Sequence, residues 1–228
     1  MFYLTALPQA GFHYSEMREM DLFEFLDIGA RTLIPIIVFC AIYNREKLTK
    51  RTKLFVIYLA SYFLINLPTF FHNESENLRW TAFSIATLLE SLFLYYFISE
   101  HIKSISRLRF LWMGIIVLLW FFSFGKLWFP FLTTEVTPFF NTIVNAMLAL
   151  LSAVVLFKTV SSEHPLDRNI EFWLFCGVFV YKLSTVLLVA FIPFSFHSDV
   201  WYLHSLYFIF GGVFYVIGFC RSKSVAEN

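Results

Sequence analysis

The sequence predicts an all-α integral membrane protein, a bundle of seven transmembrane helices. Of its 228 residues, 59% are apolar, whereas an ordinary soluble domain has about 45–50%. Asp, Glu, Lys and Arg together make up only 14%, against roughly 25% in a typical soluble domain. A soluble particle of this size needs a polar surface that so few charged residues cannot form. We therefore expect the lipid bilayer to cover its apolar surface.

Seven apolar segments, each long enough to cross a bilayer, follow one another along the chain. A helix needs about 20 apolar residues to span the hydrocarbon core. Lipid permits only helices and closed barrels, and these segments lack the period-two alternation of barrel strands. The predicted spans are 24–43, 54–71, 79–98, 109–129, 138–157, 171–193 and 200–220.

The first span carries two charged residues, Asp27 and Arg31, near its start. The two residues are four positions apart, so they can pair on one helix face near the lipid headgroups. The segments between the spans are too short to hold a second domain. The predicted organisation is an outer N-terminal segment (1–23), a membrane domain (24–220) and a cytoplasmic tail (221–228).

Lys and Arg residues lie mostly on one side of the predicted bundle, in three loops and the tail. Because loops rich in Lys and Arg stay in the cytoplasm, we expect the N-terminus outside and the C-terminus inside the cell. The opposite side carries far fewer basic residues. Those on the predicted cytoplasmic side are Arg45, Lys47, Lys50, Arg51, Lys53, Lys103, Arg107, Arg109, Lys158, Arg168, Arg221 and Lys223.

Two spans end alike, which suggests an internal repeat. The second span ends in Pro68-Thr-Phe-Phe-His72, and the sixth ends in Pro193-Phe-Ser-Phe-His197. The helices that follow begin with Trp80 and Trp201. These matches favour a parallel 3+1+3 arrangement in which span four joins two copies. Such matches arise easily in a chain with 31 Phe residues, so the repeat is a hypothesis.

Glu90 and Lys182 are charged residues near the middle of the third and sixth spans. A charge at the centre of a bilayer costs roughly 2.5–3.5 kcal/mol on insertion scales. Such residues are retained where they face the bundle interior and are paired or hydrated. The two lie at matching depths, so an ion pair between them is geometrically feasible. It could serve a ligand or ion site, or simply clamp two helices together.

Further polar residues have the helical spacing to face the same interior. Thr81, Ser84, Thr87 and Ser91 form a stripe on the third span. Ser, Thr and Asn also act as ordinary contacts between membrane helices, and the sequence leaves both roles open. The candidate ligand-binding residues are Glu90, Lys182, Asn66, Asn141, Asn145, Tyr181 and His204.

Several kinds of chemistry lack their motifs in this sequence. There is no helical His pair with a third metal ligand, no Gly-rich phosphate loop and no nucleophile elbow. We therefore expect no enzyme activity, no metal and no cofactor. Cys40, Cys176 and Cys220 lie in apolar runs without a disulfide or zinc pattern, which predicts packing roles. The net charge of +1 gives no reason to expect nucleic acid as a partner.

The aromatic run Phe172–Tyr181 and the aromatic last span, together with the seven-span architecture, resemble small seven-transmembrane sensor proteins of the Bacteroidota type. This resemblance implies a receptor-like component of a bacterial inner membrane that binds a small molecule or ion within the bundle. We expect no kinase domain fused to the bundle, so the signal would pass to a separate cytoplasmic or membrane partner.

Two other functions fit the same architecture. A transporter or channel for small solutes would use the charged midplane site, and helix count and orientation are similar to those of SWEET sugar carriers and vitamin-precursor carriers. A non-catalytic membrane subunit would use the polar residues only for assembly. Solute flux would indicate a carrier, whereas ligand binding without flux would indicate a sensor. The ligand itself cannot be deduced from the residues.

Overall fold

The protein is helical throughout the part of the chain that its structure, a computed structural model, describes: residues 22–67, 76–128, 137–161, 166, 169–191 and 200–221. No β-strand occurs in these ranges, so the all-α prediction is confirmed for them. The helices are α1 (Leu22–Tyr43), η1 (Arg45–Lys47), α2 (Lys50–Asn66), α3 (Glu76–Ser99), α4 (Lys103–Ser106), α5 (Arg109–Trp128), α6 (Thr137–Val160), α7 (Ile170–Phe191) and α8 (Val200–Arg221).

Four of the described helices contain segments long and apolar enough to cross a membrane. Two further helices contain shorter apolar segments, Ile28–Tyr43 and Arg109–Phe124. These apolar helices indicate a membrane protein, as the composition predicted. The four long segments are Thr81–Ser99, Thr142–Val160, Ile170–Leu188 and Leu203–Arg221.

A long helix lies in each of the seven ranges expected to be spans, with ends that differ by a few residues. The largest shift at a helix start is in α2, which begins at Lys50 instead of position 54. Thr49 precedes it in an extended conformation, and its side chain accepts a hydrogen bond from the backbone N–H of Thr52 at 3.2 Å. This N-cap satisfies an unpaired amide of the first turn. The helix can therefore start within the basic segment.

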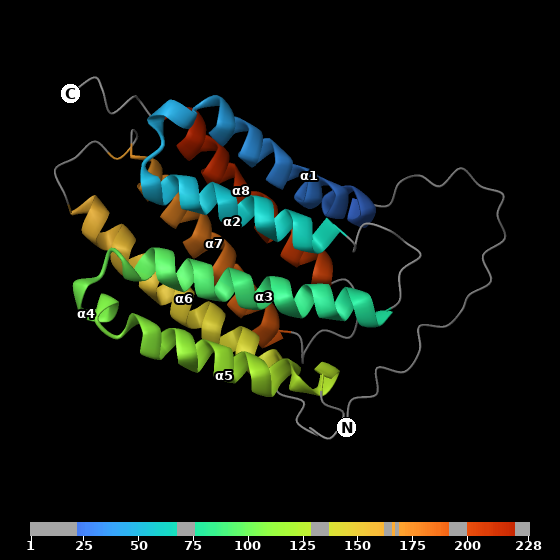
Figure 1. Cartoon of the computed structure of the whole chain (residues 1–228). Coiled ribbons are helices and arrows are strands. Elements are labelled where there is room, and N and C mark those ends of the chain that lie inside the picture. The colour runs from blue at the N-terminus through green and yellow to red at the C-terminus, as the bar shows by residue number, and fades with distance from the viewer. Residues whose placement is uncertain are drawn as a thin grey trace, which may run out of the picture.

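The long helices run side by side in a bundle (Figure 1). The main contacts join α1 to α2, α2 to α3, α3 to α6, α6 to α7, α7 to α8 and α8 back to α1. Six helices thereby close a ring, and α5 packs on its outside against α3 and α6. Side chains from α3 and α7 can therefore meet inside the ring.

Aromatic side chains fill the interior of this ring. Phe55 on α2 packs edge-on against Tyr58 and Tyr215, with ring centroids 5.8 and 5.1 Å away. Tyr58 in turn stacks on Phe93 of α3 at 4.4 Å. Phe55 is fully buried and Tyr215 is nearly so. Such aromatic pairs contribute roughly 0.5–1.5 kcal/mol each beyond the area they bury.

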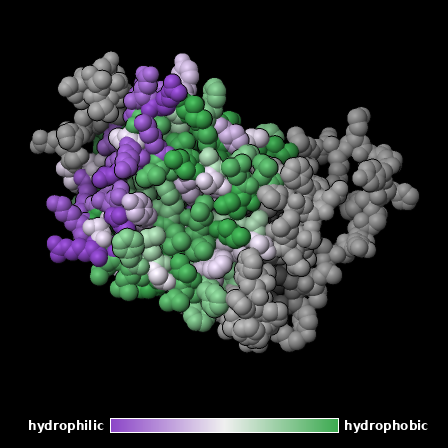
Figure 2. Space-filling view, in the orientation of Figure 1, coloured by the Kyte–Doolittle hydropathy of each residue, from purple (hydrophilic) through white to green (hydrophobic). Residues whose placement is uncertain are grey.

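Large apolar side chains also cover the outside of the bundle. Phe39, Phe110 and Phe157 are 69%, 82% and 75% exposed, and apolar residues dominate the visible face between the two ends (Figure 2). A monomer in water rarely shows so large a continuous apolar surface. Contact with lipid explains this surface.

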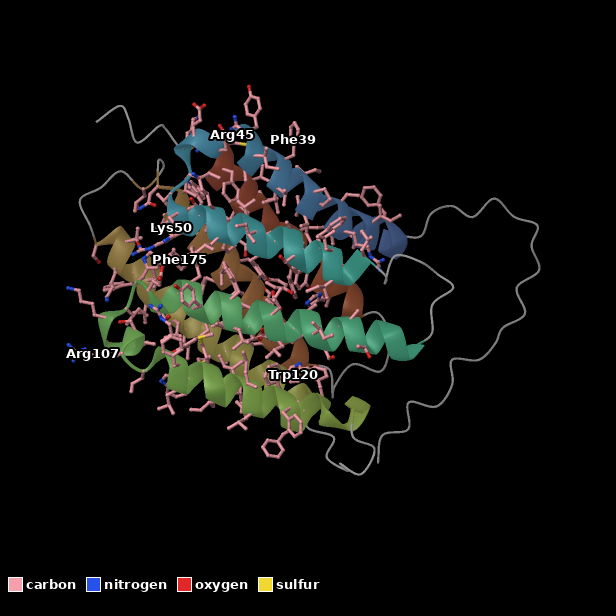
Figure 3. The ribbon with its side chains drawn as sticks, viewed as in Figure 1. Phe39, Arg45, Lys50, Arg107, Trp120 and Phe175 are labelled. Carbon is pink, nitrogen blue, oxygen red and sulfur yellow. The ribbon has the colours of Figure 1, made fainter. Side chains whose placement is uncertain are left out.

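Charged residues gather at the end of the bundle that carries η1, α4 and the first turn of α2 (Figures 2 and 3). Glu100 accepts contacts there from two cations, Arg51 at 3.2 Å and Arg109 at 3.7 Å. The Arg109 guanidinium also lies 4.5 Å from the centre of the Tyr96 ring. These contacts connect the ends of α2, α3 and α5 in one charged network.

Glycines allow α7 and α8 to approach closely. A methyl group at Gly177 would lie 2.6 Å from the carbonyl oxygen of Gly211 and would overlap the Tyr215 ring. A methyl group at Gly211 would lie 3.0 Å from the Tyr181 Cβ atom. Small residues at such positions let membrane helices pack backbone to backbone. This contact fixes Tyr181 on α7 relative to α8.

The suggested 3+1+3 repeat depends on the two Pro-x-x-Phe-His segments, which lie outside the described residues, as do most of the outer segment and the tail. The repeat therefore stays a prediction.

Candidate functional site

Glu90 and Lys182 form an ion pair in the interior of the bundle. The Lys182 Nζ atom lies 2.9 Å from Oε2 of Glu90, and the side chains are only 2% and 10% exposed. The pair connects α3 to α7, far from the ends of both helices. A buried charge is tolerated when a counter-charge and hydrogen bonds replace its lost hydration. The depth match in the sequence therefore indicated a real contact.

Tyr181 and His204 extend this polar centre from α7 to α8. The Tyr181 hydroxyl lies 3.1 Å from Nε2 of His204, and the Lys182 ammonium lies 4.7 Å from the centre of the Tyr181 ring. The same ring packs edge-on against Phe208 at 5.4 Å. Two of the predicted residues, Tyr181 and His204, are thus brought together with the ion pair. They supply a hydroxyl and an imidazole that can each donate or accept a hydrogen bond.

Three more tyrosines interact electrostatically with Glu90, and the set of candidates chosen from the sequence did not include them. Tyr58 and Tyr62 on α2 and Tyr215 on α8 all lie within range of its charge. Tyr58 and Tyr62 are four residues apart, a spacing that places them on one helix face. That spacing indicates a shared face, but it does not reveal which helix the face contacts.

The three asparagines among the candidates are less closely tied to the pair. Asn145 is 8% exposed on α6, a helix that packs against both α3 and α7. Asn66 and Asn141 lie in α2 and α6, but their side chains are outside the described ones. Their place in a site remains a prediction.

The hydroxyl stripe on α3 bonds to its own helix. Ser84 donates to the carbonyl of Thr81 at 2.9 Å, Thr87 to Phe83 at 2.8 Å and Ser91 to Thr87 at 2.7 Å. Hydroxyl groups in membrane helices commonly satisfy themselves in this way. These side chains therefore already have an acceptor, and the polar centre is formed by the longer side chains.

Among the described residues, no group of three His, Cys, Asp or Glu side chains is arranged to hold a metal ion. His72 and His197, the other histidines considered from the sequence, lie outside the described ranges. The buried Glu90 is instead paired with Lys182.

Comparison with known proteins finds no matching protein family, curated protein or solved structure. The function must therefore be argued from the residues themselves. The polar centre, defined as Glu90, Lys182, Tyr181, His204 and the tyrosines around Glu90, joins α2, α3, α7 and α8. It can offer a cation, an anion and several neutral hydrogen-bonding groups to one small molecule or ion.

Proposed function

We propose that this chain is a seven-span membrane sensor that binds a small polar molecule or ion at its polar centre. In this proposal each of the seven long helices crosses the cell membrane of a bacterium. The N-terminus lies outside, and the charged end with Arg45, Lys50 and Arg107 faces the cytoplasm. The support is the excess of basic residues in the loops at that end, since such loops are retained inside.

The observation that carries the proposal is the Glu90–Lys182 ion pair, buried together with Tyr181 and His204. Ionisable residues within membrane spans are costly and commonly mark a binding site or a proton path. A ligand carboxylate could replace Glu90 beside Lys182, and a ligand amine could replace Lys182 beside Glu90. Either exchange would break the link between α3 and α7. Binding would thereby be converted into helix movement.

The signal would pass to a separate protein, without catalysis by this chain. The charged end carries the short helices η1 and α4 and the network around Glu100. A shift of α3 relative to α7 would move this end. We therefore place the contact with a signalling partner there.

Thermal unfolding in nanodiscs, with a panel of small carboxylates and small amines, tests the binding step. A ligand of the site should raise the unfolding midpoint of the wild-type protein. Lys182→Met should abolish the response to carboxylates, and Glu90→Gln the response to amines. Ser152→Ala is the matched control. Its hydroxyl is also fully buried but bonds only to Leu148 of its own helix, and it should leave the responses unchanged. A carboxylate or amine that stabilises all four proteins equally would contradict binding at the pair.

A carrier is the second candidate, because two paired charges inside the bundle and on different helices also suit a transport site. Flux of a stabilising compound into proteoliposomes would favour the carrier. Stabilisation without flux favours the sensor. A protein that neither binds nor transports, and is stable only in a stoichiometric complex, would be an assembly subunit.

A further inference from the structure

Cys40 on α1 and Cys220 on α8 lie next to each other, although almost the whole sequence separates them. The Cys220 side chain lies close enough to Cys40 to interact with its thiol. Both are free cysteines, and each lies close to the end of its helix that also carries Arg45 or Arg221. The sequence predicted packing roles for all three cysteines and gave no sign that two of them lie together.

The packing of α1 on α8 accounts for this proximity independently. A methyl group at Gly29 would lie 3.6 Å from Cδ1 of Ile209, and one at Gly212 would contact Leu33 and, at 3.5 Å, Ile37. The contacts advance in the same direction along both helices, so α1 and α8 lie parallel. Cys40 follows Gly29 by as many residues as Cys220 follows Ile209. The helix register therefore brings the two cysteines to the same level.

The two thiols differ in accessibility. Cys220 is exposed, whereas Cys40 is half-buried. A reagent can therefore reach Cys220 first, with Cys40 next to it as the second thiol. Redox-responsive cysteines have this arrangement: an accessible thiol beside a resolving one. Cys176, the third cysteine, lies on α7 and provides an internal comparison.

We propose that Cys40 and Cys220 form a redox modification site that closes to a reversible disulfide between α1 and α8. The oxidant is a small-molecule disulfide. The Cys220 thiolate attacks one of its sulfurs, its S–S bond breaks, and one small thiolate leaves, which gives a mixed disulfide on Cys220. The Cys40 thiolate then attacks the Cys220 sulfur and releases the second small thiolate. The protein loses two electrons, the small disulfide gains them, and the two protein protons end on the two small thiols.

The disulfide would covalently join two helices that pack against each other. Because α8 carries His204 and Tyr215, a change in its position relative to α1 would also move these two residues of the polar centre. The modification itself does not depend on what binds there. A structural disulfide is rare in the cytoplasm, and one that forms and opens there usually senses redox state. In the proposed orientation the charged end faces the cytoplasm, where a reversible disulfide is the expected kind.

Oxidised glutathione is the probe that tests the pair on the purified protein in detergent. The working background is Cys176→Ser, which leaves only the two cysteines of interest. After oxidation and denaturation, a polymer-tagged maleimide counts the free thiols, and mass spectrometry identifies the linked peptides. We expect the thiol count to fall from two to zero, with a peptide link between Cys40 and Cys220 and no retained glutathione. Dithiothreitol should restore both thiols.

Removing one partner distinguishes the pair from two independent thiols. With Cys40→Ser in the same background, Cys220 should retain glutathione as a stable mixed disulfide. With Cys220→Ser, Cys40 should stay largely unmodified. An unchanged helical circular-dichroism spectrum shows that each variant is folded. Retained glutathione on Cys220 beside a free Cys40, or a disulfide between two molecules through Cys220, would overturn the proposal.

Discussion

The Nζ atom of Lys182 on α7 lies 2.9 Å from Oε2 of Glu90 on α3, and both side chains are almost inaccessible. The two helices belong to a ring in which α6 packs against both of them. The long side chains therefore span the interior and meet there. Each charge compensates the other, so a change to one alone exposes the full cost of burying its partner.

A double-mutant cycle measures this coupling. Glu90→Gln and Lys182→Met should each lower the free energy of unfolding by about 3–5 kcal/mol, because each leaves an unpaired buried charge. The double variant should regain most of that loss, since no net charge is then buried. Unfolding of the four proteins in one detergent, followed by circular dichroism, gives the four values.

Additive losses in this cycle would contradict the coupling. Single variants as stable as the wild type would show that the charges contribute little to the fold. A strongly coupled result shows that the pair also acts as a clamp between α3 and α7. The thermal-shift screen with small carboxylates and amines then tests ligand binding separately.

The class of protein and the ion pair could be predicted from the sequence for the same physical reason. A long apolar segment in lipid can form only a helix or a strand of a closed barrel. The sequence therefore predicted helices in the ranges where the structure has them. Glu90 and Lys182 stand out because charges are rare in such segments. Their matching depths in the two spans were enough to predict that they could pair.

The rest of the polar centre depends on tertiary contacts that no local pattern reveals. Tyr58 and Tyr215 belong to a chain with 11 Tyr, and only the packing of α2 and α8 brings them near Glu90. Cys40 and Cys220 lie on the first and last long helices, so their contact follows from the α1–α8 register. The hydroxyls of Ser84 and Ser91 donate hydrogen bonds to carbonyl groups of their own helix. Residue spacing along one helix could not show which of these side chains contact another helix and which bond within their own.

Tyr181→Phe should lower the free energy of unfolding by about 1 kcal/mol, because it removes the hydroxyl that contacts His204 and keeps the ring beside Lys182. The matched control is Tyr95→Phe, whose hydroxyl is buried without a hydrogen-bond partner. That change should be neutral or stabilising, since it removes an unsatisfied polar group. Unfolding midpoints of the two variants, measured side by side, give the comparison. An equal effect of both changes would mean that the contact with His204 contributes nothing.

Gly177→Ala should destabilise the bundle by about 1–3 kcal/mol, the usual cost of overpacking. Its new methyl group would lie 2.6 Å from the Gly211 carbonyl oxygen and overlap Tyr215, so α7 and α8 would have to separate. Gly114→Ala on α5 is the control, because nothing lies within 4 Å of its added methyl group. It should be neutral or stabilising by up to about 1 kcal/mol, since alanine favours a helix over glycine. Thermal melts that rank the two changes in the opposite order would refute the close contact.

The stability of the charged end should fall in acid because of His101. The pKa of His101 is lowered from 6.5 to about 4, mainly by burial and also by the Arg51 charge, while the Glu100 charge opposes the change. The imidazole is therefore neutral at pH 7, and its 3.8 Å contact with Glu171 is not an ion pair there.

The unfolded chain binds a proton at His101 below pH 6.5, whereas the folded chain does so only near pH 4. Its contribution to stability is therefore complete above pH 6.5 and is lost as the pH falls from 6.5 to 4. His101→Gln should make the unfolding free energy less dependent on pH in that window, and wild-type melts from pH 4 to 8 supply the reference. Parallel pH profiles for the two proteins would show that His101 gains its proton as readily in the fold as in the unfolded chain. In that case the imidazole would reach water, or pair with Glu171, instead of being held neutral between the Phe97 and Phe175 rings.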